Sequence, residues 1–260
     1  MFVPTPARRD KFENQKKHYL SKIKFNHVTH EYRGITALEN ISFELGEDKI
    51  TAIIGKSGSG KSTLLQIING LIVPTSGEVY VYGEKLDYNK INETRLKIGY
   101  SVQGTGLFPH MTVYDNIALL GKITNKLKHD IERRIDLLMS FVSLNPQYKT
   151  KYPHELSGGE QQRVGICRSM ILNPEIFLLD EAFGALDPTT RSELHTEFLK
   201  LQEFEPRTIV LVTHDFREAL KLADNIMIIE KGVIQQFGSK EEILSKPANE
   251  FVRNFVSTQT

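Results

Sequence analysis

The stretch Ile50-Thr51-Ala52-Ile53-Ile54-Gly55-Lys56-Ser57-Gly58-Ser59-Gly60-Lys61-Ser62 decides the fold of this 260-residue chain. It begins with an all-apolar run, which is typical of a strand buried on both faces. A glycine loop follows and leads into a predicted helix, Lys61–Leu71, which ends before Pro74 and a turn at Ser76-Gly77. A strand, a glycine loop and a helix in this order are what a phosphate-binding loop requires.

The glycine loop fits the pattern G-x-x-x-x-G-K-[ST]. Its glycines let backbone N–H groups turn toward phosphate oxygens, and the start of the helix adds its dipole. We expect Lys61 to reach the β- and γ-phosphates, Ser62 to ligate Mg²⁺ and Thr63 to lie beside the α-phosphate. The residues predicted to hold a nucleotide are Gly55, Lys56, Ser57, Gly58, Ser59, Gly60, Lys61, Ser62 and Thr63.

The rest of the chain extends this pattern on both sides. Two strand-like segments, Ile23–Val28 and Ala37–Leu45, flank a turn at Arg33-Gly34. Between about Gln103 and Leu156 the apolar residues recur at helical spacing, which predicts an inserted helical subdomain. Helices and strands then alternate with short connections, which favours a parallel sheet wrapped by helices. Further strands are predicted at Val79–Tyr82, Ile98–Val102, Ile176–Asp180, Thr208–Thr213 and Ile226–Glu230, and further helices at Gly158–Leu172, Thr189–Leu201, Phe216–Leu222, Lys240–Ser245 and Glu250–Val256.

Polar residues stand at the ends of three predicted strands, where ligands bind in sheets of this kind. Asp180 is expected to stay ionised and hold the metal, and Glu181 to polarise an attacking water as general base. His214 follows another apolar strand; by itself such a histidine is more often a structural hydrogen-bonding residue. Gln103 follows a third strand, where its amide can meet Mg²⁺ or the lytic water. The residues predicted to act in catalysis are Glu181, His214, Lys61 and Gln103, and those predicted to hold metal are Ser62, Gln103 and Asp180.

A second glycine-containing block, Leu156-Ser157-Gly158-Gly159-Glu160-Gln161-Gln162-Arg163, opens another predicted helix. Ser157 and Glu160 have the spacing of a capping box, which explains these two residues but not the glycine pair. Gly158 and Gly159 weaken the first helical turn by up to about 1 kcal/mol each relative to alanine. Bare backbone amides at this position are useful when an anion must approach closely. We therefore expect a second phosphate contact, made to a nucleotide that two subunits share.

Composition excludes several classes of protein. The 33 lysine and arginine residues balance 32 acidic ones, so the charge gives no support for a nucleic-acid-binding face. Cys167 is the single cysteine, so no intramolecular disulfide can form. The apolar runs are far shorter than the roughly 20 residues of a membrane-spanning helix, so a partner must supply any link to a membrane. Residues 1–21 are predicted to form a solvated tail, with contact to anionic lipid as the alternative.

These motifs resemble those of the ATP-binding cassette (ABC) transporter ATPases from about Ile23 to Val256. The resemblance implies an α/β P-loop NTPase core with a mostly parallel sheet, an N-terminal antiparallel β subdomain and an inserted α-helical subdomain. The ATPase domain would span 22–260, with a RecA-like/β core over 22–102 and 157–260 and the helical subdomain over 103–156. It also implies a head-to-tail dimer around two ATP molecules with Mg²⁺, each held by Gly55–Thr63 of one subunit and Ser157–Glu160 of the other.

The resemblance assigns further roles. Tyr32 matches the aromatic residue that stacks on adenine, with an ordinary strand tyrosine as the alternative. Gln103 matches the glutamine that links the nucleotide site to the helical subdomain, and Ala185-Leu186-Asp187 matches the dimer-contact loop. His214 matches the switch histidine that contacts the γ-phosphate.

Within the family, the chain is similar to the ATPases of bacterial importers of quaternary-amine osmoprotectants such as glycine betaine, carnitine and choline. The segments that carry this likeness are Ile98-Gly99-Tyr100, Gly106-Leu107-Phe108-Pro109-His110-Met111-Thr112-Val113 and Ala182-Phe183-Gly184-Ala185-Leu186-Asp187-Pro188. Gly104 departs from the type by replacing a second glutamine. Since the sequence ends at Thr260, we also expect no C-terminal regulatory tandem.

The implied partners are a second ATPase subunit and integral membrane permease subunits that dock near Gln103–Val113, with Phe108 as a candidate contact. A solute-binding protein or domain would take part indirectly, no nucleic acid is expected, and the location would be the cytoplasmic face of the cell membrane. One alternative is the same ATPase in a lipid-extraction or export system. The other is a non-transport ATPase acting on nucleic acid or the ribosome, for which coiled-coil insertions, paired cassettes or a basic stripe are typical.

Overall fold

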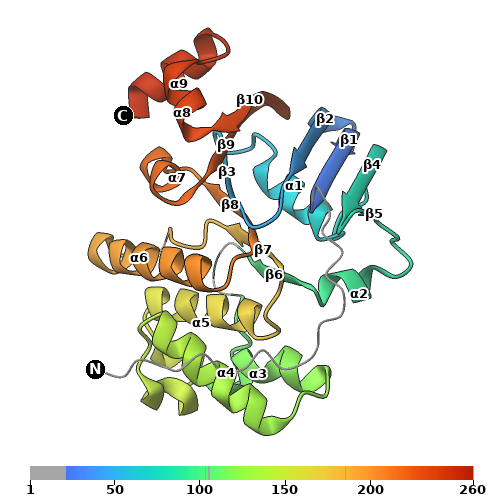
Figure 1. Cartoon of the computed structure of the whole chain (residues 1–260). Helices are drawn as coiled ribbons and strands as arrows, with labels where there is room; N and C mark the ends of the chain where they lie inside the picture. Colours follow the sequence, from blue (N-terminus) through green and yellow to red (C-terminus); the bar gives the residue numbers. More distant parts are fainter. Residues whose placement is uncertain (1–21, 103, 105, 185, 260) are drawn as a thin grey trace.

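The computed structural model describes residues 22–102, 104, 106–184 and 186–259. The predicted tail over 1–21, Gln103 and Ala185 lie outside these residues. The described residues form two sheets, and a group of helices packs at one end of the molecule (Figure 1).

The N-terminal sheet is antiparallel and has the strand order β2-β1-β4-β5. The strand bounds are β1 Ile23–Tyr32, β2 Ile35–Leu45, β4 Ser76–Val81 and β5 Glu84–Lys85. Pairing of Tyr32 with Ile35 places Arg33-Gly34 at the hairpin turn, as predicted. Both residues have a left-handed backbone, with φ of +50° and +81°. The hairpin therefore places Tyr32 beside its turn, where its hydroxyl contacts Thr63 of α1 (Lys61–Ile68).

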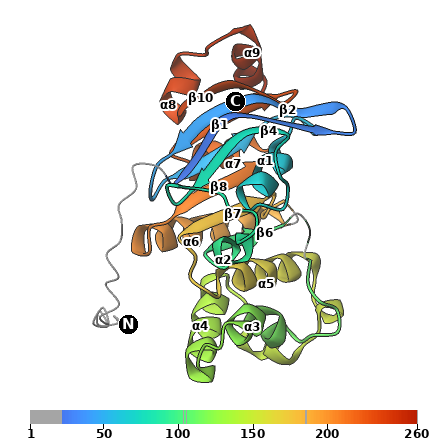
Figure 2. The ribbon, with the colours of Figure 1, turned by 90° about the vertical axis from the view of Figure 1, so that its right-hand side faces the viewer.

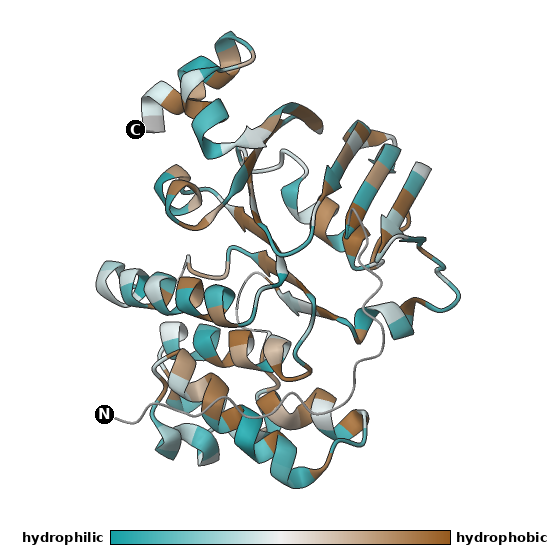
Figure 3. Cartoon of the chain, in the orientation of Figure 1, coloured by the Kyte–Doolittle hydropathy of each residue, from teal (hydrophilic) through white to brown (hydrophobic). Residues whose placement is uncertain are grey.

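The larger sheet has the order β10-β9-β3-β8-β7-β6. Its strands β3, β8, β7 and β6 run parallel, as do β3 and β9, whereas β10 pairs antiparallel with β9. The bounds are β3 Ile50–Ile54, β6 Ile98–Ser101, β7 Ile176–Asp180, β8 Thr208–Thr213, β9 Asn225–Glu230 and β10 Val233–Ser239. Every residue of β3, β7 and β8 is buried, which explains why these strands are mostly apolar (Figure 3).

Helices lie on both sides of this sheet and continue into the predicted insert (Figure 2). The insert contains α3 and α4, and α5 connects it with the sheet; an apolar cluster joins all three helices to β3 and β7. The bounds are α2 Ile91–Arg95, α3 Val113–Ile123, α4 Lys128–Phe141, α5 Gly158–Met170, α6 Pro188–Phe204, α7 Phe216–Leu222, α8 Lys240–Ser245 and α9 Glu250–Gln259, with short 3₁₀ helices at Pro146–Thr150 and Pro153–Glu155.

A second apolar cluster fills the space between α1, the opposite face of the large sheet and the antiparallel sheet. It includes Phe25 and Phe43, whose rings stack at 4.7 Å, and Leu64 and Leu65 of α1. The glycine loop before α1 is thus held between two packed sheets.

The sequence-based prediction is wrong at the proposed turn Ser76-Gly77, because both residues belong to β4 and Ser76 pairs with Thr29. A Cβ on Gly77 would come within 2.6 Å of Val28 Cα, so the glycine allows β1 to approach closely instead of forming a turn. The helix predicted to reach Leu71 ends at Ile68, and Gly70 is left-handed at φ +64°. The strands β5 and β10 and the helix α2 were not predicted.

In the described part of the chain, no helix has the length and apolar character needed to span a bilayer.

Candidate nucleotide site

The glycine loop enters α1 through a backbone that other residues rarely adopt. Gly58 and Gly60 have φ of +76° and +104°, and Gly60 is the N-cap of α1 without any side-chain cap. A Cβ on Gly60 would lie 2.6 Å from the carbonyl oxygen of Ala37 in β2. Glycine is therefore required here for both conformation and space, and the first amides of α1 have no side-chain acceptor.

Lys61 lies inside the loop with 6% of its surface exposed. Its Nζ donates to the carbonyl oxygens of Gly55 at 2.8 Å and Lys56 at 2.9 Å. Burial lowers the pKa of this ammonium, and the carboxylates of Glu181 and Asp180 oppose the shift. The lysine is thus stretched along the loop, where its charge can serve phosphate oxygens.

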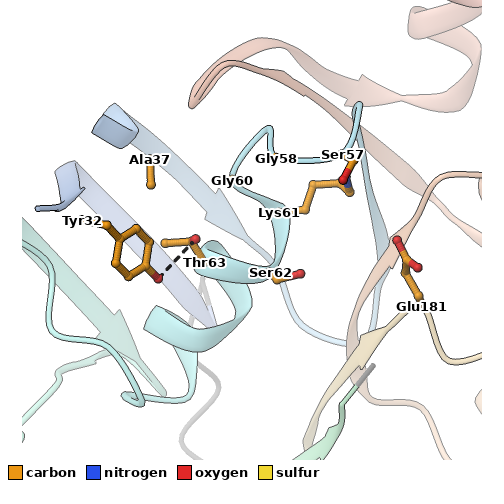
Figure 4. Close-up of a pocket in the computed structure, with 9 residues that line it drawn as sticks. All are labelled: Tyr32, Ala37, Ser57, Gly58, Gly60, Lys61, Ser62, Thr63 and Glu181. Carbon is orange, nitrogen blue, oxygen red and sulfur yellow. Dashed lines mark hydrogen bonds between the residues drawn. The ribbon is translucent and has the colours of Figure 1, made fainter. Parts of the chain in front are cut away.

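A pocket of about 330 Å³ lies over the loop and the start of α1 (Figure 4). Its lining residues are Tyr32, Ala37, Ser57, Gly58, Gly60, Lys61, Ser62, Thr63 and Glu181. Tyr32 stands at one side, 44% exposed, with its hydroxyl 3.5 Å from Thr63 Oγ1. The buried His30 ring meets the Tyr32 ring edge to face at 4.5 Å. This arrangement leaves an aromatic ring available at one end of the pocket and the carboxylate of Glu181 at the other.

Oxygen atoms suited to Mg²⁺ meet below the pocket. Ser62 Oγ donates to Asp180 Oδ1 at 3.2 Å, although the two residues are 118 positions apart. Burial raises the pKa of Asp180, with Ser62 and Lys61 acting against the shift. A hydroxyl and a carboxylate at this spacing fit the Mg²⁺ habit of taking one or two protein ligands and completing its shell with phosphate and water. A bound cation would also favour the ionised form of Asp180.

Glu181 follows β7 in a left-handed conformation, with φ +50°. Its N–H donates to the Val212 carbonyl at 3.0 Å, and its carbonyl accepts from Gln162 Nε2 of α5 at 3.1 Å. These backbone contacts fix the direction of the side chain, and His214 Nδ1 lies 3.6 Å from Glu181 Oε1. The predicted base and the predicted switch histidine, distant in sequence, are therefore neighbours.

Asp215 caps α7, accepting from the backbone N–H groups of Arg217 at 2.9 Å and Glu218 at 3.2 Å. Asp215 is therefore the N-cap of α7. The side chain of His214, just before it, is largely exposed.

The second glycine block has the predicted capping box at the start of α5. Ser157 Oγ accepts from the Glu160 N–H at 3.3 Å, and Glu160 Oε2 accepts from the Ser157 N–H at 2.7 Å. Burial acts against the charge of Glu160, but the bonds from Ser157 and Tyr148 lower the pKa of this carboxyl. None of Ser157, Gly158, Gly159 and Glu160 is among the described residues that line the pocket.

The remaining predicted residues lie at or near the loop. Lys56 and Ser57 belong to the glycine loop, where the Lys56 carbonyl accepts from Lys61, and Ser59 is buried behind it. Gly55 packs against the Ile229 carbonyl, which leaves no room for a Cβ. Ala37 lines the pocket without having been predicted, because an alanine far upstream of the loop gives no chemical signal.

Taken together, the glycine loop, the buried strand ending in two carboxylates and the helix start with its bare glycines define the ATP-binding cassette. The chain belongs to the ABC transporter family, whose model matches residues 38–184. The resemblance inferred from the sequence is thus confirmed.

Individual relatives indicate which members of this family the chain is similar to. The chain is 44% identical over 238 residues to the glycine betaine/carnitine/choline transport ATP-binding protein OpuCA of Bacillus subtilis, which covers 91% of the chain and 63% of OpuCA. It is 42% identical over 233 residues to the glycine betaine uptake system ATP-binding protein YehX of Escherichia coli, covering 90% of the chain and 76% of YehX. The chain thus spans less than two thirds of the length of OpuCA.

The fold is that of solved cassettes. A dimeric structure of a post-hydrolysis state of the ATP-binding cassette MJ0796, bound to ADP and Pi, matches with a TM-score of 0.78 at 33% identity. The match covers 84% of this chain and 98% of MJ0796. The predicted fold class, with its antiparallel β subdomain and mostly parallel sheet, is confirmed.

Proposed function

We propose that this chain is the ATP-hydrolysing subunit of a membrane importer for a quaternary-amine osmoprotectant such as glycine betaine, carnitine or choline. The observation that carries the ATPase part is that Lys61, Ser62 and Glu181 line one pocket and that Ser62 bonds Asp180 beneath it. The transported class rests on the relatives, whose names refer to glycine betaine, carnitine and choline.

In this proposal the loop N–H groups and Lys61 bind the phosphates, and Tyr32 stacks on the adenine ring. Asp180 and Ser62 hold Mg²⁺, which neutralises charge on the phosphates during transfer. Glu181 orients and polarises the attacking water, for which its fixed backbone and its position at the edge of the pocket are suited. His214, beside Glu181, contacts the γ-phosphate side of the nucleotide.

A second copy of the cassette completes the site in trans through Ser157–Glu160. Support for this comes from Gly158, because a Cβ added there would meet nothing within 4 Å. Packing inside this chain therefore does not require a glycine at that position, whereas close approach of an external anion does. The ADP-bound MJ0796 cassette is dimeric.

The permease would dock on the helical part of the cassette near residues 103–113. Phe108 is 41% exposed and is fixed from both sides, since its N–H donates to Asn116 Oδ1 at 2.8 Å and the Arg168 guanidinium lies 5.8 Å from its ring. An ordered, exposed aromatic side chain is a suitable anchor for another protein. The cassette would then lie at the cytoplasmic face of the membrane, held there by the permease, with a solute-binding protein or domain on the opposite side.

The test is to purify the tagged Glu181→Gln protein with ATP from detergent-solubilised native membranes and identify what comes with it. A polytopic membrane protein is the expected partner, and the solute-binding component associated with it should bind a betaine, carnitine or choline. Ribosomal or DNA-associated partners without any membrane protein would refute the importer proposal. Absence of ATP hydrolysis by the wild-type protein, assembled with its partner, would refute the enzymatic part.

A further inference from the structure

A buried pair of ionisable side chains lies outside the predicted site but directly beneath it. His195 Nε2 of α6 lies 2.8 Å from Glu218 Oε1 of α7, and the two residues are 4% and 7% exposed. Replacing a buried pair of this kind with apolar residues is often neutral or stabilising, so stability alone does not explain it. The position of the pair in the fold points to a role in the site.

Each partner stands on a helix that begins at a functional turn. Helix α6 begins after Asp187, its N-cap, in the segment predicted to contact the second subunit. Helix α7 begins after Asp215, immediately following His214. The hydrogen bond between His195 and Glu218 therefore connects the two turns through the N-terminal parts of α6 and α7.

The pair also reaches the segment that carries the predicted base. The ring of Phe183, two residues after Glu181, meets the His195 ring edge to face at 4.9 Å. Glu218 itself lines a small cavity of about 20 Å³ together with Glu181 and His214. Glu218 therefore shares a cavity large enough for about one water molecule with the two side chains nearest the proposed reaction.

Two further side chains, Arg191 and Lys221, make polar contacts near the pair. Arg191 NH1 of α6 lies 3.9 Å from Asp215 Oδ2, and Arg191 NH2 donates to the carbonyls of Leu186 at 2.8 Å and Gly184 at 3.3 Å. Lys221 Nζ donates to Ser192 Oγ at 3.2 Å, but both residues are at the surface. Among these contacts, the His195–Glu218 bond is the fully buried one, where a hydrogen bond is strongest and its loss most costly.

We propose that His195 and Glu218 are positioning residues: by holding α7 against α6 they fix His214 and Glu181 relative to each other and make them follow the dimer-contact turn. Movement of that turn by a partner subunit is then transmitted to the hydrolytic side chains through the buried bond. This inference rests on the proposed ATPase function and deepens it, because it names the link by which subunit contact controls the site.

The test compares ATP hydrolysis by the wild type and three sets of variants in the assembled transporter. Glu218→Ala should lower kcat about 10- to 100-fold, the cost of a misplaced catalytic geometry, while KM for ATP changes by less than about threefold. Glu218→Gln keeps an oxygen that can accept from His195 Nε2 and should recover kcat to within roughly threefold of the wild type. His195→Leu/Glu218→Leu should fold with a stable core and still show the low kcat.

The matched control is Glu197→Ala. It removes the exposed ion pair with Lys200 on α6, the helix that carries His195, and should leave kcat unchanged. The inference is overturned if folded Glu218→Ala or the double leucine variant keeps wild-type kcat, if the loss appears in KM alone, or if Glu218→Gln is no better than Glu218→Ala.

Hydrogen exchange provides a second test of the coupling, and this test does not depend on ATP hydrolysis. In Glu218→Ala, the amides of residues 189–194 at the start of α6 should exchange faster than in Glu197→Ala, because the substitution on α7 releases α6. Unchanged exchange there would overturn the coupling even if the wild type hydrolyses ATP. If the wild-type protein hydrolyses no ATP but Glu218→Ala shows the expected faster exchange, the proposed function is refuted, whereas the coupling between α6 and α7 is supported.

Discussion

Replacing Asp180 with asparagine should stabilise the nucleotide-free protein while removing its activity. The carboxyl group of Asp180 is 4% exposed, accepts from Ser62 Oγ at 3.2 Å and has a pKa raised by burial. A raised pKa means that the ionised form is disfavoured in the folded state. Asparagine has the same shape, keeps an oxygen that can accept from Ser62 and carries no charge. The substitution therefore removes the free-energy cost of burying a charged group.

The expected gain is about 0.5–2 kcal/mol, the usual size of a single stabilising substitution at a site kept for function. For a domain of this size 1 kcal/mol corresponds to roughly 2–4 °C, so Tm should rise by about 1–8 °C. In the same variant the loss of a charged metal ligand should lower hydrolysis on the order of 10²–10³-fold, because a bound cation contributes several kcal/mol to the transition state.

The gain in stability should also depend on pH, in a direction that follows from the raised pKa of Asp180. Since the folded protein binds the Asp180 proton more tightly than the unfolded chain, the stability contributed by the wild-type residue falls as pH rises through its raised pKa. The advantage of Asp180→Asn is therefore complete above that pKa and is lost as pH falls toward the ordinary value of 3.8.

Thermal unfolding of both proteins between pH 8 and the lowest pH at which they remain folded, without nucleotide or Mg²⁺, measures this difference. Asp136→Asn is the control, because Asp136 is exposed on α4 in an ion pair with Lys149 and its loss should shift stability by no more than about 0.5 kcal/mol. A lower Tm for Asp180→Asn at neutral pH, or a gain that grows toward acid pH, would refute the reasoning.

Three further substitutions test other parts of the site. Ser157→Arg should leave nucleotide binding to one subunit intact but prevent ATP-dependent dimers, as judged by light scattering with the Glu181→Gln background; a dimer that still forms would contradict the shared site. Tyr32→Ala should weaken ATP binding by about 1–3 kcal/mol, the usual size of one base–aromatic stacking contact, whereas Tyr32→Phe should not. Tripolyphosphate should bind equally well to both variants. Calorimetry measures these affinities. Gly60→Ala should weaken ATP binding at least about tenfold, since its Cβ would meet the Ala37 carbonyl at 2.6 Å and its φ is +104°; unchanged affinity in the folded variant would show that the loop can adjust.

The sequence predicted the phosphate loop and the parallel core well because each depends on local signals. Buried strands such as β3 are mostly apolar, and the glycines at 55 and 60 follow a fixed spacing before Lys61. Lys61 was assigned from the loop pattern, Asp180 and Glu181 from the ends of strands, and Tyr32 from the family resemblance. The structure places Tyr32, Lys61 and Glu181 around one pocket and Asp180 directly beneath it. Their chemical roles stay predictions.

What the sequence did not predict depends on contacts between distant segments. Gly77 has the signature of a turn but serves the close approach of two strands. Ala37 lines the pocket through its place in β2, and His195 pairs with Glu218 across 23 residues, yet neither residue belongs to a recognisable pattern. Strand β10 carries two adjacent glutamines that interrupt apolar alternation, and its identity comes from pairing with β9. The limits 103–156 proposed for the helical subdomain also stay a prediction.

The apolar cluster that joins α3, α4 and α5 to the large sheet limits how the cassette can move. Ile117, Ile135 and Val164 belong to the same continuous cluster as Ile54 and Phe177 of the sheet, so swinging the helical part open would pull these packed apolar side chains apart. Opening such an interface would expose buried side chains at a cost of about 25 cal/mol for each Å². Displacement of the helices, and of the Ser157–Glu160 segment at the start of α5, should therefore proceed as shear: small sliding steps between packed side chains that keep the core closed throughout.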